Sequence, residues 1–134
     1  MRIFLDTNVL VSALTTRGLC AALFESVLVE HDLLASAGLL AELRRILSDR
    51  FRMPPAVVDG YIELIGTTAE LVVAIGPAPD GIPDPDDAPL IAAALAGGAA
   101  CFVTGDKALL ALGAAGGLPL ISPREFWERT RIGA

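Results

Sequence analysis

The chain has 134 residues, which is enough to bury a hydrophobic core, and we expect residues 1–134 to form a single domain. Hydrophobic residues make up 54% of the sequence, and this content excludes an intrinsically disordered protein. The formal net charge of −6 argues against a protein that binds nucleic acid on a broad basic face. It does not exclude an enzyme that acts on nucleic acid, because clustered acids bind divalent cations.

Three features of the sequence indicate a cytoplasmic protein without a membrane segment. Only three apolar residues separate Arg2 from Asp6, so we expect no signal peptide. Cys20 and Cys101 lie in apolar surroundings without metal-ligand spacing, which is typical of buried thiols in a reducing compartment. The uncharged stretch 88–105 is broken by glycines in its middle, so a buried helix and a buried strand explain it better than a membrane span.

The first predicted element is a strand over Ile3–Leu5, a continuous apolar run that is typical of a strand buried on both faces. The run ends at Asp6, and helices are predicted over Val9–Leu14 and Leu19–Val29. Asp6 and Asn8 have two interpretations. They either cap a helix or form an Asx-turn, or they are the first polar groups of a site at the edge of a sheet.

A second buried strand is predicted over Leu33–Ala35, and Ser36 is a suitable N-cap for a helix from Gly38 to about Arg50. On a helical wheel, Glu42 falls at the edge of the apolar stripe of this helix. It is either a boundary residue that reaches solvent or pairs with Arg45, or a carboxylate that binds a metal ion.

The middle of the chain predicts a helix over Val57–Thr67 and an edge strand over Glu70–Ile75. A loop rich in Pro, Gly and Asp follows, and we expect Asp87 to be the N-cap of a helix over Leu90–Ala96. One acid is enough to cap a helix. Three acids within four residues exceed this need, and they are Asp84, Asp86 and Asp87.

The remaining elements repeat the pattern of the first. A buried strand over Ala100–Val103 runs into Asp106, as the first strand runs into Asp6. A short helix beginning near Leu109 and a strand over Leu118–Ile121 follow. The chain then carries a capping box and a terminal helix, with the box formed by Ser122-Pro123-Arg124-Glu125.

Strands that alternate with helices predict an α/β fold with a doubly wound, mostly parallel sheet. Parallel strands present their carboxyl ends at one edge, so Asp6 and Asp106 should face the same crevice. Glu42 and the acids of 84–87 begin or flank helices packed there. Such acids repel one another unless cations lie between them, and carboxylate oxygens suit Mg²⁺ or Mn²⁺.

Taken together, these motifs resemble the PIN-domain family, and most closely its bacterial and archaeal toxins of toxin–antitoxin pairs, similar to VapC. The resemblance runs from Arg2 to about Trp127. It rests on Leu5-Asp6-Thr7-Asn8-Val9-Leu10, Glu42-Leu43-Arg44-Arg45-Ile46-Leu47, Asp84-Pro85-Asp86-Asp87, Val103-Thr104-Gly105-Asp106-Lys107 and Pro123-Arg124-Glu125-Phe126.

The resemblance implies a compact three-layer α/β/α fold and a metal-dependent ribonuclease, usually a homodimer and usually inhibited by a small antitoxin protein. By motif, the metal-binding and catalytic acids are Asp6, Glu42, Asp87 and Asp106. Asn8 and Thr104 are implied as supporting polar groups. Relatives often carry a further acid where this chain has Ala88, so Asp84 and Asp86 stay open as alternatives to Asp87.

The chemistry predicted from these residues is hydrolysis of an RNA phosphodiester by a metal-activated water. The sequence has no Ser or Cys nucleophile motif and no His base, and Lys107, Arg44 and Arg45 are candidates for holding phosphate. Two other classes stay open. One is a Mg²⁺-dependent phosphotransfer or phosphatase-type domain, within which a phosphatase of the haloacid-dehalogenase type would need an acid where this chain has Asn8. The other class is a catalytically silent module that binds a partner protein through the acidic crevice.

Overall fold

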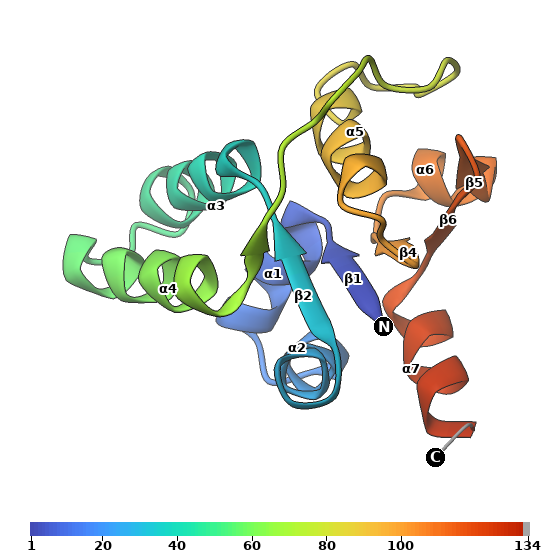
Figure 1. Cartoon of the computed structure of the whole chain (residues 1–134). Coiled ribbons are helices and arrows are strands. Elements are labelled where there is room, and N and C mark those ends of the chain that lie inside the picture. The colour runs from blue at the N-terminus through green and yellow to red at the C-terminus, as the bar shows by residue number, and fades with distance from the viewer. Residues whose placement is uncertain (133–134) are drawn as a thin grey trace.

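A six-stranded sheet forms the centre of the computed structural model, which describes residues 1–132, and its strand order is β3-β2-β1-β4-β6-β5 (Figure 1). The strands are β1 (Arg2–Leu5), β2 (Asp32–Ala35), β3 (Glu70–Leu71), β4 (Cys101–Val103), β5 (Ala114–Ala115) and β6 (Leu118–Ile121). Helices lie on both sides of the sheet, which confirms the predicted α/β/α architecture. They are α1 (Thr7–Thr15), α2 (Leu19–Glu30), α3 (Ala37–Asp49), α4 (Pro55–Thr68), α5 (Ala88–Ala96), α6 (Lys107–Leu112) and α7 (Pro123–Ile132).

Strand β1 lies in the middle of the sheet and pairs in parallel with β2 on one side and β4 on the other. Phe4 is opposite Leu34 in β2 and Phe102 in β4, and the two phenyl rings stack with centroids 5.4 Å apart. Ile3, Phe4 and Leu5 are all fully buried. The first strand is therefore covered on both faces, as its continuous apolar run predicts.

The predicted helix starts are confirmed where a local side chain caps them. Ser36 Oγ accepts a hydrogen bond from the backbone N–H of Leu39 at 3.2 Å and caps α3. At the start of α7, Ser122 Oγ accepts from the backbone N–H of Glu125 at 3.1 Å. These bonds satisfy N–H groups that the first helical turn leaves without an intrahelical partner.

One strand prediction was wrong in its extent, and one strand was not predicted. The expected strand Glu70–Ile75 is regular only over Glu70–Leu71, and beyond it Val73 and Ile75 are 80% and 90% exposed. Its β-branched composition favours a strand, but Val72, whose N–H bonds to the Ala35 carbonyl at 2.8 Å, is the last residue with a partner in β2. Strand β5 was not predicted, and it pairs antiparallel with β6 through a Gly116-Gly117 turn.

No single helix of the described chain is long and apolar enough to cross a membrane. The pair α1 and α2, bent by 106° at its break, meets that criterion by length and composition only.

Candidate active site

The carboxylate of Asp6 lies at the carboxyl end of β1 and is held by three hydrogen bonds. Its Oδ1 accepts from the backbone N–H of Thr7 at 2.8 Å. Its Oδ2 accepts from Thr104 Oγ1 at 2.7 Å and from Asn8 Nδ2 at 3.2 Å. With only 4% of Asp6 exposed, these bonds fix a buried carboxylate at the edge of the sheet. The structure thus brings Asp6, Asn8 and Thr104 together, as the sequence motifs predict.

The end of β4 is tied to the end of β1 by the same network. Thr104 is fully buried, and its Oγ1 also accepts from the backbone N–H of Asp106 at 3.0 Å. Asn8 Oδ1 accepts from the N–H of Gly105 at 3.0 Å. Two loops that are about a hundred residues apart in sequence therefore form one hydrogen-bonded unit, because parallel strands end at the same edge.

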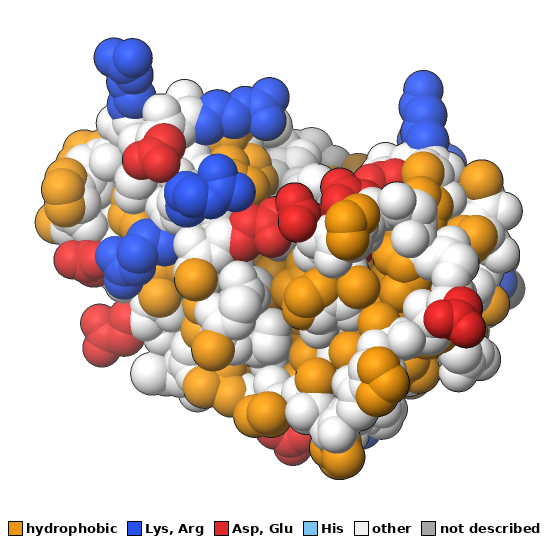
Figure 2. Space-filling view, turned by 90° about the horizontal axis from the view of Figure 1, so that it is seen from above, with side chains coloured by type: hydrophobic (Ala, Val, Ile, Leu, Met, Phe, Trp, Pro, Cys, Tyr) orange, Lys and Arg blue, Asp and Glu red, His pale blue; other side chains and the backbone are white. Residues whose placement is uncertain are grey.

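Glu42 from α3 and Asp87 from the start of α5 line the same groove as Asp6. The groove has a volume of about 420 Å³. It lies at the edge of the sheet toward which β1 and β2 point in Figure 1, and Figure 2 looks onto this edge. A row of acidic side chains crosses that face, with Lys and Arg side chains on either side (Figure 2). The lining residues are Asp6, Thr7, Asn8, Val11, Ser12, Thr15, Thr16, Glu42, Ile46, Arg50, Phe51 and Asp87.

The pKa values of the acids in the groove are raised by burial and by the negative charges of neighbouring acids. Burial is the main reason why the pKa of Asp6 is raised, and the negative charge of Asp106 adds to it. Burial and then the charge of Asp6 raise the pKa of Glu42, while the nearby Arg45 lowers it. The pKa of Asp87 rises from an ordinary 3.8 to about 6, through burial and the charges of Asp6, Asp84, Asp106 and Glu42. Such mutual repulsion is typical of acids gathered to bind a cation.

Asp106 lies beside the groove and has a second role. Its Oδ1 accepts hydrogen bonds from the N–H groups of Ala108 at 2.8 Å and Leu109 at 3.2 Å, so it caps α6. It is absent from the groove lining among the described residues, but its charge acts on the pKa of both Asp6 and Asp87. One carboxylate oxygen of Asp106 thus stabilises a helix while its charge contributes to the acidic centre.

The acids of the loop before α5 divide their roles differently from the prediction. Asp87 occupies the N-cap position with backbone angles of the right-handed helix, φ −80° and ψ −20°, and its side chain makes no capping hydrogen bond. The predicted capping role of its carboxylate was therefore wrong, since a capping side chain needs an extended backbone at this position. Asp84 Oδ1 instead accepts from the N–H of Asp86 at 2.9 Å and holds the turn. The charge of Asp86 acts on Glu42.

The three basic candidates differ in their surroundings. Arg44 forms an ion pair with Asp59 of α4 at 2.6 Å, which directs its guanidinium toward α4. Arg45 lies close enough to Glu42 to lower its pKa. Lys107 is the exposed first residue of α6, next to Asp106.

Part of the groove was not predicted from the sequence. Thr7 is buried, and its hydroxyl lies close enough to Glu42 to lower its pKa without making a hydrogen bond of normal geometry among the described residues. Arg50 and Phe51 line the far part of the groove. The only signal for the latter pair was a charged and aromatic stretch at the end of a helix, Arg50-Phe51-Arg52, which is equally typical of a solvated turn.

The donor set suits a hard divalent cation. Carboxylate and hydroxyl oxygens are the ligands that Mg²⁺ and Mn²⁺ prefer, and here they come with raised pKa values. In the described part of the chain, no three acid, His or Cys side chains stand in a geometry that holds one ion. The carboxylate of Asp87 is only partly buried and makes no capping hydrogen bond to α5.

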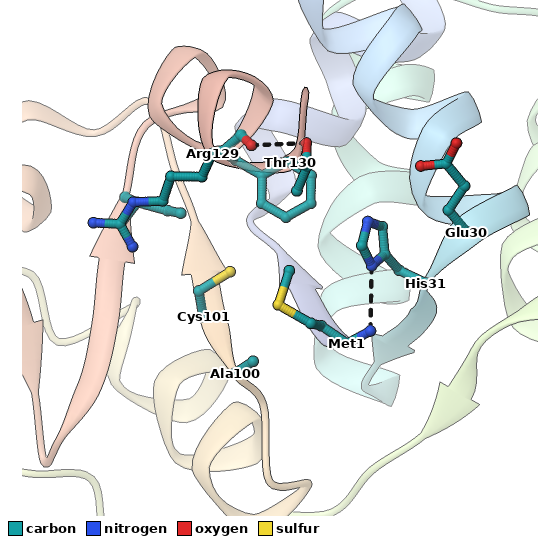
Figure 3. Close-up of a pocket in the computed structure, with 9 residues that line it drawn as sticks. Met1, Glu30, His31, Ala100, Cys101, Arg129 and Thr130 are labelled. Carbon is teal, nitrogen blue, oxygen red and sulfur yellow. Dashed lines mark hydrogen bonds between the residues drawn. The ribbon is translucent and has the colours of Figure 1, made fainter. Parts of the chain in front are cut away.

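A second cavity, of about 370 Å³, lies at the opposite end of β1 and has different chemistry (Figure 3). There the ammonium group of Met1 donates to His31 Nδ1 at 3.2 Å. Burial lowers the pKa of His31 and raises that of the Cys101 thiol to about 11, so both groups are neutral near pH 7. This cavity offers neither a thiolate nucleophile nor an acid cluster.

Comparison with known proteins decides the family. A PIN-domain family model matches residues 2–108, most of the chain. The chain belongs to the PIN-domain family. PIN domains are generally nucleases and typically use divalent metal ions.

A solved structure supports the fold of this PIN domain. The VapBC2 complex from Rickettsia felis, bound to a DNA fragment from its promoter, contains a similar chain with a TM-score of 0.61. The match covers 91% of this chain and 98% of that chain at 18% identity, which makes it a likeness of fold. No curated protein matches this sequence.

Proposed function

We propose that this PIN domain is a Mg²⁺- or Mn²⁺-dependent endoribonuclease and the toxin of a toxin–antitoxin pair. One observation carries the proposal. Asp6, Glu42 and Asp87 come from three separate segments and line one groove, where burial and the charge of Asp6 raise the pKa of both Glu42 and Asp87. Acids that serve only solubility are spread over a surface, whereas acids held together at a cost in free energy indicate a bound cation.

In this proposal Asp6 is the fixed ligand, because its hydrogen bonds leave it little freedom. Glu42 and Asp87 approach the cation from the helices on either side, and the charge of Asp106 strengthens the negative potential. A bound Mg²⁺ or Mn²⁺ supplies a water of lowered pKa and positive charge beside the phosphate. The roles of the protein are to hold that cation, to orient the phosphodiester along the groove and to keep Asp6 ionised through Thr104.

We further propose a small antitoxin protein as partner, a homodimer and a cytoplasmic location. The similarity in fold to a chain of the VapBC2 complex supports the first of these, since that complex contains such a pair. The acidic groove is a suitable place for a basic side chain of a partner, because its carboxylates repel one another in the absence of a cation.

The decisive experiment is cleavage of single-stranded RNA by purified protein with Mg²⁺, with Mn²⁺ and with a chelator. We expect metal-dependent cleavage that Asp6→Asn and Glu42→Gln each reduce by at least about a hundredfold, a loss typical of an essential catalytic group. Glu63→Gln on the exposed face of α4 and Asp80→Asn in the loop before α5 are matched controls, because both acids lie outside the groove.

Two results would change the proposal. Full activity of Glu42→Gln would make Glu42 a boundary residue of α3 and remove it from the site. Absence of cleavage by the wild-type protein, together with tight binding of a partner protein, would favour the catalytically silent module.

A further inference from the structure

The groove continues beyond the acids, and α1 and α3 form its two walls. Lining residues recur at intervals of four on both helices, so one residue from each helix faces the groove at every turn. On α3 the series runs from Glu42 through Ile46 to Arg50, and on α1 it runs from Thr7 through Val11 to Thr15. At 1.5 Å per residue, Arg50 lies about 12 Å from Glu42 along the helix. The acids occupy one end of the groove, and a basic and aromatic pair occupies the other.

This pair, Arg50 and Phe51, is placed by the end of α3. The N–H of Phe51 bonds to the carbonyl of Ile46 at 3.2 Å, which fixes its backbone against the last helical turn. The next residue, Arg52, has a φ of 52°, and this left-handed conformation turns the chain away. Phe51 remains 41% exposed, and the Arg50 guanidinium lies 5.7 Å from the centroid of its ring. The result is an aromatic face and a positive charge at the end of an otherwise acidic groove.

We propose that Phe51 is a stacking platform for an RNA base close to the scissile phosphate and that Arg50 binds the phosphate beside that base. This inference rests on the ribonuclease function proposed above and names how the substrate is positioned. A single-stranded nucleic acid combines a flat base, which stacks on an aromatic ring, with a phosphate that pairs with Arg. The span of about 12 Å places the stacked base within a few nucleotides of the acids.

The walls between the two ends agree with this occupant. Thr15 Oγ1 donates to the carbonyl of Val11 and Thr16 Oγ1 to that of Ser12, both at 2.7 Å. Thr16 Oγ1 also accepts from the N–H of Gly18 at 3.5 Å, whereas Thr15 Oγ1, which lines the groove, keeps its acceptor lone pairs. Such lone pairs suit the N–H groups of bases and the 2′-hydroxyl of ribose. Val11 and Ile46 supply apolar surface on which a ribose or base can lie.

The test is binding of short fluorescent single-stranded RNA, measured by anisotropy in Ca²⁺ buffer. Each RNA of the series carries one abasic position, moved along the strand. We expect Phe51→Ala to weaken binding of the intact RNA by about 5- to 100-fold, and Phe51→Trp to retain it. One abasic position should weaken binding to the wild type but not to Phe51→Ala, since the ring and the base form a coupled pair. Arg50→Ala should weaken binding to every RNA of the series and reduce its salt dependence.

Leu112→Ala is the control for Phe51→Ala, because Leu112 is also 41% exposed and lies in α6, away from the groove. Equal binding by Phe51→Ala and the wild type, equal abasic penalties in both, or no RNA binding by the wild type would each overturn the inference. If Phe51→Ala and the abasic position are coupled in binding but no RNA is cleaved, the stacking role of Phe51 is supported and the nuclease function is refuted. Metal-dependent cleavage without coupling would refute the platform alone.

Discussion

Removing the negative charge of Asp87 should stabilise the metal-free protein in a pH-dependent way. The folded state raises the pKa of this carboxyl to about 6 from an ordinary 3.8, so ionising it costs more in the folded than in the unfolded chain. The cost is absent below the ordinary pKa and complete above the raised one. If Asp87 were fully shielded from solvent, the extra cost of ionising it in the folded state would be about 3 kcal/mol. Because Asp87 is only partly buried, we expect a cost of about 1 kcal/mol.

Asp87→Asn keeps the shape of the side chain and removes the charge. The variant should therefore be more stable than the wild type by this free energy near pH 8 and no more stable than the wild type near pH 4. For a domain of this size the gain corresponds to about 3 °C in Tm. The assay is thermal unfolding by circular dichroism with a chelator, at a series of pH values. Asp80→Asn, in the same loop and exposed, is the control. A variant no more stable than the wild type near pH 8, or an advantage that persists at pH 4, would refute the electrostatic account of the groove.

Three further predictions concern the metal, the network and the packing. Mg²⁺ or Mn²⁺ should raise the Tm of the wild type, because a cation at a hundredfold excess over its Kd stabilises the folded state by about 2.7 kcal/mol. Asp6→Asn should reduce this rise, and a Tm that neither ion changes would contradict the shared cation site. Thr104→Val removes the 2.7 Å hydrogen bond to Asp6, so chemical denaturation near neutral pH should show a loss of about 1–3 kcal/mol that Thr104→Ser avoids. Gly97→Ala places a Cβ 2.6 Å from Val72 Cγ1 and should cost about 1–3 kcal/mol in thermal unfolding, whereas Gly38→Ala, with open space, should not.

The sequence predicted elements whose causes are local. The apolar run Ile3–Leu5 and the cap at Ser36 depend on neighbouring residues, and both were confirmed. The Glu70–Ile75 strand was predicted too long, because composition does not tell where the partner strand ends. The hairpin strand β5 consists of two alanines, and its only signal was the Gly116-Gly117 turn.

In the candidate site, too, some features could be predicted from the sequence and others could not. Asp6 and Asp106 could be placed at one edge because parallel strands end together, and the acids of the groove were named from motifs. The sequence did not reveal which of these acids caps a helix with its carboxylate. Asp87 was expected to cap α5 and does not, while Asp106 caps α6 and was not expected to. The pair Arg50 and Phe51 was missed, since the exposed side of a helix end carries no periodicity that marks it.

The hydrogen bond between Thr104 and Asp6 joins residues 98 positions apart, and this separation has a consequence for synthesis. The first strand leaves the ribosome early and has β2 to pair with, but its other neighbour, β4, is translated about 5–20 s later at ordinary rates. Until then the Asp6 carboxylate has its local donors, Thr7 and Asn8, but lacks the hydrogen bond from Thr104. The complete hydrogen-bonded unit around Asp6, and the acidic groove with it, can therefore form only in the last part of synthesis.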